Sequence, residues 1–293
     1  MNRFAHLVLT LVLAALAVQF VTRVVLAQGG RSQRIVAVVP AVTEMLFAIG
    51  AGPQVVGVSS FARYPATVVS LPRVGALLDP DIEHILSLEP DLVVLYGSQT
   101  DAMEQMSRAG IDVFPYRHGG IPEVIAMLRE LGRRTGQAVA ADAIVSSVES
   151  KLASVAARVS SRPKPRVLLV LGREPDAIRN VYASGGIGFL HDMIVAAGGE
   201  NIFAHVTREA VQPTSEGILA AAPDVIVEIR AEGMLSPDEA STQHNVWQRL
   251  PAIPAVRRNR VYFLTGNDLI VPGPRLAQAT ERLAQVLHPA AFE

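Results

Sequence analysis

Residues 83–94, EHILSLEPDLVV, recur 133 residues later as residues 216–227, EGILAAAPDVIV. Each copy reads as a short helix with a glutamate in its first turn, then a Pro-Asp turn, then a buried strand. An apolar run repeats at nearly the same offset, as RIVAVV at 34–39 and RVLLVL at 166–171. A period this long predicts two similar α/β domains rather than a solenoid of short units.

The composition is that of a folded chain without a basic surplus. The 293 residues are 50% hydrophobic and carry a formal net charge of −1. This excludes disorder, offers no basis for nucleic-acid binding, and leaves enough chain for two cores. There is no cysteine, which excludes disulfides, thiolate metal sites and a cysteine nucleophile.

The first 27 residues are typical of a signal peptide. Arg3 supplies the positive start, residues 7–21 are apolar, and VLA at 25–27 fits a cleavage site before Gln28. An uncleaved membrane anchor is the alternative, although Arg23 interrupts the apolar run that a spanning helix needs. We expect a cleaved protein in the periplasm, without a lipid anchor because no cysteine is present to carry one.

Strand and helix patterns alternate through both halves, which predicts parallel sheets covered by helices. The expected strands are 34–39, 55–58, 91–96, 111–116, 166–171, 224–229 and 260–264. The expected helices are 40–50, one opened by Asp79 and Pro80, 100–109, 187–197, 215–221 and 274–288, with most of 121–160 helical as a rigid connector. The resulting division is a signal peptide 1–27, an N-terminal α/β lobe 34–132, a linker helix 133–163 and a C-terminal α/β lobe 164–293.

The ligand site of such sheets lies at the loops that follow the carboxyl ends of the strands. Here those loops are 40–44, 61–64, 75–78, 96–99, 172–176, 184–188, 211–215 and 266–275. If the lobes face each other, these loops surround one cleft. Glu83 and Glu216 lie near the same rim, and their symmetry suggests a partner that contacts both lobes. The helix dipole alone also favours an acid in a first turn.

An ordered set of motifs resembles a known family. They are RIVAVVPAVTEMLFAIGAG at 34–52, VVGVSSFARYP at 55–65, LPRVG at 71–75, EHILSLEPDLVV at 83–94, AGGENIF at 197–203, SE at 215–216, PD at 223–224 and VPGPR at 271–275. Together they resemble the periplasmic substrate-binding proteins of ABC importers for cobalamin, haem and ferric siderophores. The likeness extends from residue 34 to about 288, and residues 59–65 and 75–83 are most similar to the cobalamin-binding subgroup.

The resemblance implies two Rossmann-like lobes with parallel sheets, joined by one long rigid interdomain helix and showing little hinge motion. It implies capture of a corrinoid between the lobes and delivery to an ABC permease dimer in the inner membrane, contacted through Glu83 and Glu216. Ferric siderophore or haem is the alternative ligand. The chelate is cargo, so no cofactor, catalytic residue or resident metal is expected, and the protein is expected to be a monomer.

Eight residues are predicted to bind the ligand, and they are Phe61, Tyr96, Leu77, Ala41, Gly185, Gly186, Asn267 and Asp268. Phe61 and Tyr96 offer aromatic faces, whereas Leu77 and Ala210 stand where cobalamin binders can carry tryptophans. Tyr64, Tyr116 and Trp247 are expected to be packing residues, and Arg275 is expected to anchor its loop. His118 either contacts the metal of the ligand or is an ordinary turn residue.

Two rival functions remain open at this point. An exported two-lobed metal-dependent hydrolase would need a nucleophile, a base or a metal set converging on the cleft. Ser184 and Ser215 lack an evident histidine partner, and no histidines stand at metal-ligand spacing. A sensor domain would share the fold and differ only in its membrane partner.

Overall fold

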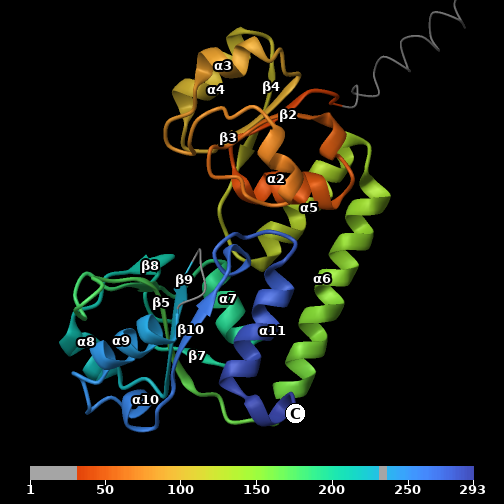
Figure 1. The fold of residues 1–293 in the computed structure, drawn as a ribbon. Helices are drawn as coiled ribbons and strands as arrows, with labels where there is room; N and C mark the ends of the chain where they lie inside the picture. Colours follow the sequence, from red (N-terminus) through yellow and green to blue (C-terminus); the bar gives the residue numbers. More distant parts are fainter. Residues whose placement is uncertain (1–31, 231–235) are drawn as a thin grey trace, which may run out of the picture.

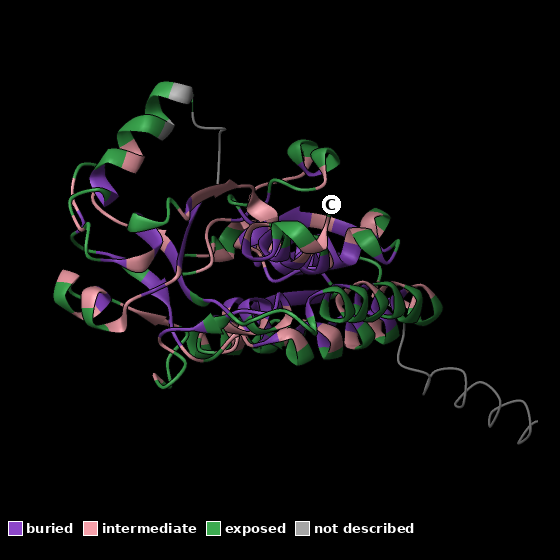
Figure 2. Ribbon diagram, turned by 90° about the horizontal axis from the view of Figure 1, so that it is seen from below, coloured by how far each residue is buried: buried purple, intermediate pink, exposed green. Residues whose placement is uncertain are grey.

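The computed structural model describes residues 32–230 and 236–293, which form two α/β lobes connected by helices (Figure 1). The predicted signal peptide at 1–27 lies outside the described residues. None of the described helices is long and apolar enough to cross a bilayer. Buried residues concentrate in the sheets and on the helix faces that cover them, while the outer helix turns are exposed (Figure 2).

The N-terminal lobe is built on a parallel sheet with the strand order β2-β1-β3-β4. Its strands are β1 (Ile35–Ala37), β2 (Val55–Val58), β3 (Leu92–Tyr96) and β4 (Asp112–Tyr116). Its helices are α2 (Pro40–Ala48), α3 (Ile82–Ser87) and α4 (Thr100–Arg108), with 3₁₀ turns η1 (Gly52–Gln54) and η2 (Ala66–Ser70). Alternate residues of β1 enter two different cores, Ile35 on one face and Val36 on the other. Burial on both faces is why β1 has no polar alternation.

The C-terminal lobe has the strand order β10-β9-β5-β6-β8, with β7 also paired to β5. Its strands are β5 (Arg166–Gly172), β6 (Tyr182–Ser184), β7 (Glu200–Asn201), β8 (Ala210–Val211), β9 (Val225–Arg230) and β10 (Val261–Thr265). Its helices are α7 (Phe189–Ala196), α8 (Ser215–Ala221), α9 (Pro237–Trp247), α10 (Pro254–Arg257) and α11 (Leu276–Leu287), with η3 (Asn267–Leu269) and η4 (Pro289–Ala291). Strands β5, β9 and β10 are parallel as expected, but β6 runs antiparallel to both β5 and β8.

The sequence repeat is also a structural repeat. Strand β1 pairs with β3 through Ile35 and Leu92. Strand β5 pairs with β9 through Val167 and Val225, which are the equivalent residues of the second copy. In each lobe the residue before the Pro-Asp turn is left-handed, with φ 47° at Glu89 and 45° at Ala222. The helices α3 and α8 therefore end within one residue of equivalent positions in the two copies.

Paired polar contacts hold each Pro-Asp turn against the first strand of its lobe. The Asp91 carboxylate accepts from the amides of Gln33 and Arg34, at 2.7 and 3.2 Å. The Asp224 carboxylate accepts from the Arg166 amide at 3.2 Å. The side chains of these arginines donate to carbonyls at the ends of the helices that lead into the Pro-Asp turns. Arg34 donates to the Leu88 carbonyl and Arg166 donates to the Ala221 carbonyl. Cations suit these carbonyls because of the helix dipole.

The connection between the lobes is made by α5 (Ile121–Thr135), α6 (Ala138–Val159) and α11. Gly136, with φ 73°, ends α5, so the predicted linker 133–163 contains the end of one helix and all of the next. Helix α11 lies beside α6 (Figure 1). Its Leu276 enters the core of the N-terminal lobe, whereas its Leu283 enters that of the C-terminal lobe. The boundaries of the domains stay a prediction.

One predicted helix start is wrong. Helix α3 begins at Ile82 with Asp81 as its N-cap, and the Asp81 carboxylate accepts from the His84 amide at 2.9 Å. The predicted cap, Asp79, belongs to a turn instead, where its carbonyl accepts from the Ala76 amide at 2.9 Å. The turn forms because Gly75 adopts φ 87°, a conformation that side chains disfavour.

Candidate functional site

Two adjoining cavities lie along the junction of the lobes. The larger, of about 370 Å³, is walled mainly by the C-terminal lobe and by His118, which follows β4. The smaller, of about 260 Å³, has walls from both lobes, with Pro40, Phe61 and Arg63 facing Asn267 and Val271. Both cavities are lined by Ile270, so they are neighbouring parts of one interlobe cleft.

The larger cavity is strongly apolar. Its apolar wall residues are Leu171, Ile187, Phe189, Leu190, Ala210, Ile229 and Ile270. The polar side chains among its described wall residues are His118, Tyr182 and Glu209. An apolar surface with a few polar groups is what a bulky, mostly non-polar small molecule requires.

The formal charges around the two cavities balance. In the smaller cavity Glu44 forms a two-contact ion pair with Arg275, with Oε1–Nη2 and Oε2–Nε distances of 2.6 and 2.9 Å. The remaining charged wall residues that the structure describes are Arg63 and Glu209, which have opposite signs. The cleft therefore has no net charge to attract a strongly anionic guest.

The Glu44–Arg275 pair joins the two lobes. Glu44 is on α2 and only 5% of its surface is exposed, while Arg275 precedes α11 and also lies over the Tyr64 ring, 4.0 Å from its centroid. Burial raises the pKa of Glu44 above its ordinary value, and the hydrogen bonds and charge of Arg275 oppose this rise. Arg275 thus anchors its loop, as predicted, and ties α2 and the Tyr64 loop to the other lobe.

Phe61 and Asn267 are the two predicted ligand residues that the fold brings to the same cavity. Phe61 is 63% exposed, which is unusual for a phenylalanine side chain and leaves its ring available to a guest. Tyr96 lies at the end of β3 and packs on Tyr116, with 5.8 Å between the ring centroids. Leu77 is partly buried against the core of the N-terminal lobe. The ligand-binding role of all four stays a prediction.

The other four predicted ligand residues are engaged within the protein. Ala41 is 2% exposed in the core of the N-terminal lobe. Asp268 forms an ion pair with Arg282 at 2.8 Å. Gly185 and Gly186 are glycines because a side chain there would meet the backbone of segment 204–208. These contacts give each of the four residues a structural role. Their role in ligand binding stays a prediction.

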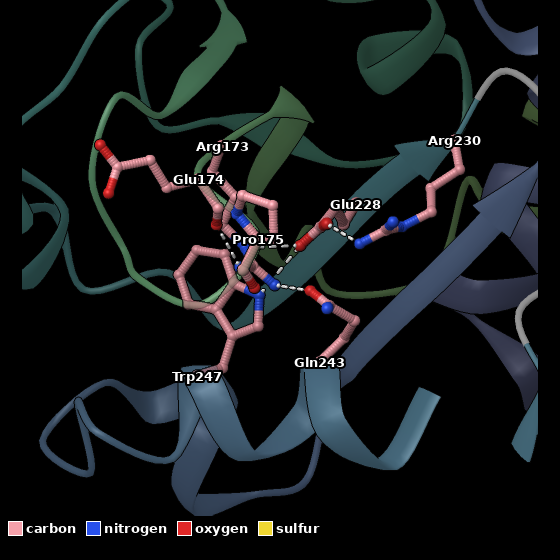
Figure 3. A network of polar contacts seen from close by, with 7 residues as sticks. All are labelled: Arg173, Glu174, Pro175, Glu228, Arg230, Gln243 and Trp247. Carbon is pink, nitrogen blue, oxygen red and sulfur yellow. Dashed lines mark hydrogen bonds and ion pairs between the residues drawn. The ribbon is translucent and has the colours of Figure 1, made fainter. Parts of the chain in front are cut away.

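The loop 172–176, also predicted to line the cleft, is held by a buried polar network (Figure 3). Glu228 is 3% exposed and accepts from Arg173 Nε at 2.9 Å, Arg230 Nη2 at 2.9 Å and Trp247 Nε1 at 3.2 Å. Arg173 also donates to the Gln243 side chain at 2.6 Å. The network fastens the loop to α9, so it is structural, as expected for Trp247.

Glu83 and Glu216 occupy equivalent positions, each exposed in the first turn of its helix. The N-caps also match, since the side chains of Asp81 and Thr214 accept from backbone amides three residues ahead. Within residues 32–230 and 236–293 neither glutamate forms an ion pair or a side-chain hydrogen bond. Helices α3 and α8 both lie on the side of their lobes remote from α6 (Figure 1). Two solvated carboxylates are thus presented at repeated sites.

Sequence reasoning missed several wall residues of the larger cavity, notably Glu209 and Tyr182, whereas Ile270 lies in the predicted loop 266–275. Tyr182 begins the three-residue strand β6 and Glu209 precedes the two-residue strand β8, and both strands are too short to show any periodicity. Among the described residues, no group of three or more His, Cys, Asp or Glu side chains could hold a metal ion.

Comparison with known proteins agrees with this architecture. The model of the periplasmic binding protein family matches residues 35–267. The chain belongs to this family. Its members are substrate-binding proteins of transport systems rather than enzymes, and this chain is likewise a substrate-binding protein.

Three relatives illustrate the range of the family. An uncharacterized ABC transporter substrate-binding lipoprotein from Bacillus subtilis, YvrC, is 30% identical over 89% of this chain and 82% of its own length. The vitamin B12-binding protein of Salmonella typhimurium is 28% identical over 87% of this chain and 90% of its own. The periplasmic heme-binding protein RhuT from Roseiflexus sp. RS-1 superimposes with a TM-score of 0.72 at 26% identity, covering 89% and 99% of the chains.

Proposed function

We propose that this protein captures a corrinoid in the interlobe cleft and delivers it to an ABC permease. Membership of the periplasmic binding protein family carries the general role. The charge balance of the cleft is the observation that supports the ligand class, because the apolar larger cavity adjoins a smaller one whose buried carboxylate is already neutralised.

The charge balance disfavours the anionic candidate ligands. Haem brings two propionates and a ferric catecholate carries several negative charges, so both call for a surplus of cations, whereas the charged wall residues that the structure describes balance in sign. A corrinoid has a large apolar ring edged by neutral amides. The relatives include a vitamin B12-binding protein, which agrees with this choice, and a heme-binding protein, which is the alternative.

A ligand titration tests the proposal. Purified protein is titrated with cyanocobalamin, dicyanocobinamide, hemin, ferrichrome and ferric enterobactin, by calorimetry and visible absorption. We expect micromolar or tighter binding of the two corrinoids and weaker binding of the others. Exclusive binding of hemin or of a siderophore would transfer the assignment to that ligand, and binding of none would refute the chelate-binding role.

We further propose that Glu83 and Glu216 contact arginines on the two halves of the permease dimer. Their equivalent positions, exposure and lack of partners in the described chain support this role. Reversing both charges, Glu83→Arg with Glu216→Arg, is expected to leave ligand binding unchanged and to abolish uptake of labelled ligand. The control reverses two other exposed acids, Glu149 and Asp238. Normal uptake by the Glu83/Glu216 variant would refute the docking role.

We also propose that the chain is exported as a monomer and cleaved after Ala27. The charged, apolar and small-residue pattern of residues 1–27 supports cleavage. N-terminal sequencing of the exported protein should begin at Gln28, and light scattering should give the mass of one chain. An N-terminus that still carries residues 1–27 would overturn the cleavage.

A further inference from the structure

His118 and Glu209 form a polar pair on the wall of the mostly apolar larger cavity. His118 Nε2 and Glu209 Oε2 are 3.7 Å apart, which is too far for a direct hydrogen bond. The two groups belong to opposite lobes, since His118 follows β4 and Glu209 precedes β8. Each therefore retains hydrogen-bonding capacity toward a molecule in the cavity.

Tyr116 determines which nitrogen of His118 carries the proton. The Tyr116 hydroxyl lies 3.1 Å from His118 Nδ1 and has no other hydrogen-bond partner in the described part of the chain. Burial raises the pKa of Tyr116, so the phenol keeps its proton and needs an acceptor. Donation to Nδ1 satisfies this need and leaves the proton of neutral His118 on Nε2.

The position of Glu209 favours the same tautomer independently. With the proton on Nε2, the ring directs an N–H toward the carboxylate. With the proton on Nδ1, a nitrogen lone pair would face that carboxylate, and the buried Tyr116 hydroxyl would have nothing to donate to. His118 is therefore a hydrogen-bond donor toward the cavity, and its single lone pair is already occupied.

The His118 ring and the backbone of Glu209 are held in place before any ligand arrives. The His118 ring packs edge-on against Phe189, with centroids 5.6 Å apart. The Glu209 stem lies against Gly188, where an added Cβ would approach its Cγ to 3.3 Å, and the Glu209 carbonyl accepts from the Gly185 amide at 2.9 Å. Such preorganisation favours selective recognition of a ligand over nonspecific binding.

We propose that His118 and Glu209 together recognise a primary carboxamide of the ligand. The amide oxygen accepts from His118 Nε2–H, and the amide NH₂ donates to the Glu209 carboxylate. The assignment rests on the proposed corrinoid function, because corrinoids carry such amides around the ring. A carboxylate in the same place would be repelled by the like charge of Glu209.

The test uses cyanocobalamin and its separated monocarboxylic acids, in each of which one side-chain amide has become a carboxylate. Wild-type protein is expected to bind cyanocobalamin about ten- to hundredfold more tightly than one of these acids, the loss typical of a hydrogen bond to a charged group. Glu209→Gln should reduce this preference, because a glutamine amide can donate to a carboxylate. Glu104→Gln, on the surface of α4, is the control and should keep the preference.

Equal binding of cyanocobalamin and all its monoacids by the wild-type protein would overturn the carboxamide assignment while leaving the corrinoid function intact. An unchanged preference in Glu209→Gln would do the same. If no corrinoid binds, both the function and the assignment fail. Nitrogen NMR of the ligand-free protein gives a separate readout, in which His118 should carry its proton on Nε2, and a proton on Nδ1 would refute the inference.

Discussion

Removal of Arg275 is expected to destabilise the protein strongly, because it leaves Glu44 buried without its counter-ion. Breaking a buried ion pair by deleting one partner typically costs about 3–5 kcal/mol. Arg275 is 25% exposed and Glu44 is 5% exposed, so the lower part of this range applies. The lost contact with the Tyr64 ring adds about 0.5–1 kcal/mol. We expect Arg275→Ala to lower the free energy of unfolding by about 3–4 kcal/mol near neutral pH.

The loss of unfolding free energy in Arg275→Ala should become smaller as the pH falls. Burial already raises the pKa of folded Glu44, and removing Arg275 abolishes the hydrogen bond and the charge that oppose this rise. A carboxyl whose folded pKa is raised contributes stability that is present below its unfolded pKa and lost as the pH rises through its folded pKa. At about pH 5 a larger fraction of Glu44 is protonated than near neutral pH, which relieves part of the penalty in Arg275→Ala.

Urea unfolding at the two pH values measures this effect. Fluorescence of the single tryptophan, Trp247, follows the C-terminal lobe, and circular dichroism follows both lobes. The control is Arg258→Ala, which breaks an exposed 2.8 Å ion pair with Asp224 and should cost at most about 1 kcal/mol. A deficit for Arg275→Ala no larger than that of the control, or one that grows on acidification, would refute the reasoning.

Two smaller perturbations test the turns. Gly75→Ala should be more destabilising than Gly50→Ala in urea unfolding. Both glycines have positive φ, but only at Gly75 would an added Cβ meet backbone, at 2.5 Å from the Asp79 carbonyl oxygen. Equal losses of unfolding free energy in the two variants would show that the turn at Gly75 relaxes. Asp91→Ala should cost about 1–3 kcal/mol by removing the acceptor for two backbone amides, and a thermal midpoint within a degree of the wild type would contradict this.

The strands and their order in the repeat were predictable from the sequence. Strands β1 and β5 are buried on both faces, so their apolar runs carried a clear signal. The antiparallel strands β6 and β8 were not predictable, because two or three residues cannot establish a period. The start of α3 was misplaced because Asp79 and Asp81 are equally good N-cap residues, and only the Gly75 turn decides between them.

The candidate site was predictable only in part. The rule that places ligands beyond the carboxyl ends of parallel strands pointed to Phe61 and Asn267, and the structure brings both to the wall of the smaller cavity. It could not tell an exposed loop side chain from a buried one such as Ala41. Nor could it show that Gly185 and Gly186 lie close to the protein's own backbone in segment 204–208.

The sequence by itself determined the duplicated α/β plan and the acids in the first turns of α3 and α8, because caps, turns and apolar periodicity act over a few neighbouring residues. Only the tertiary structure decided that Glu44 meets Arg275, 231 residues away, and that His118 faces Glu209. Such pairings join different lobes, and they arise from how α6 and α11 fix one lobe against the other. Packing of whole elements sets those distances, and no local pattern in the chain records them.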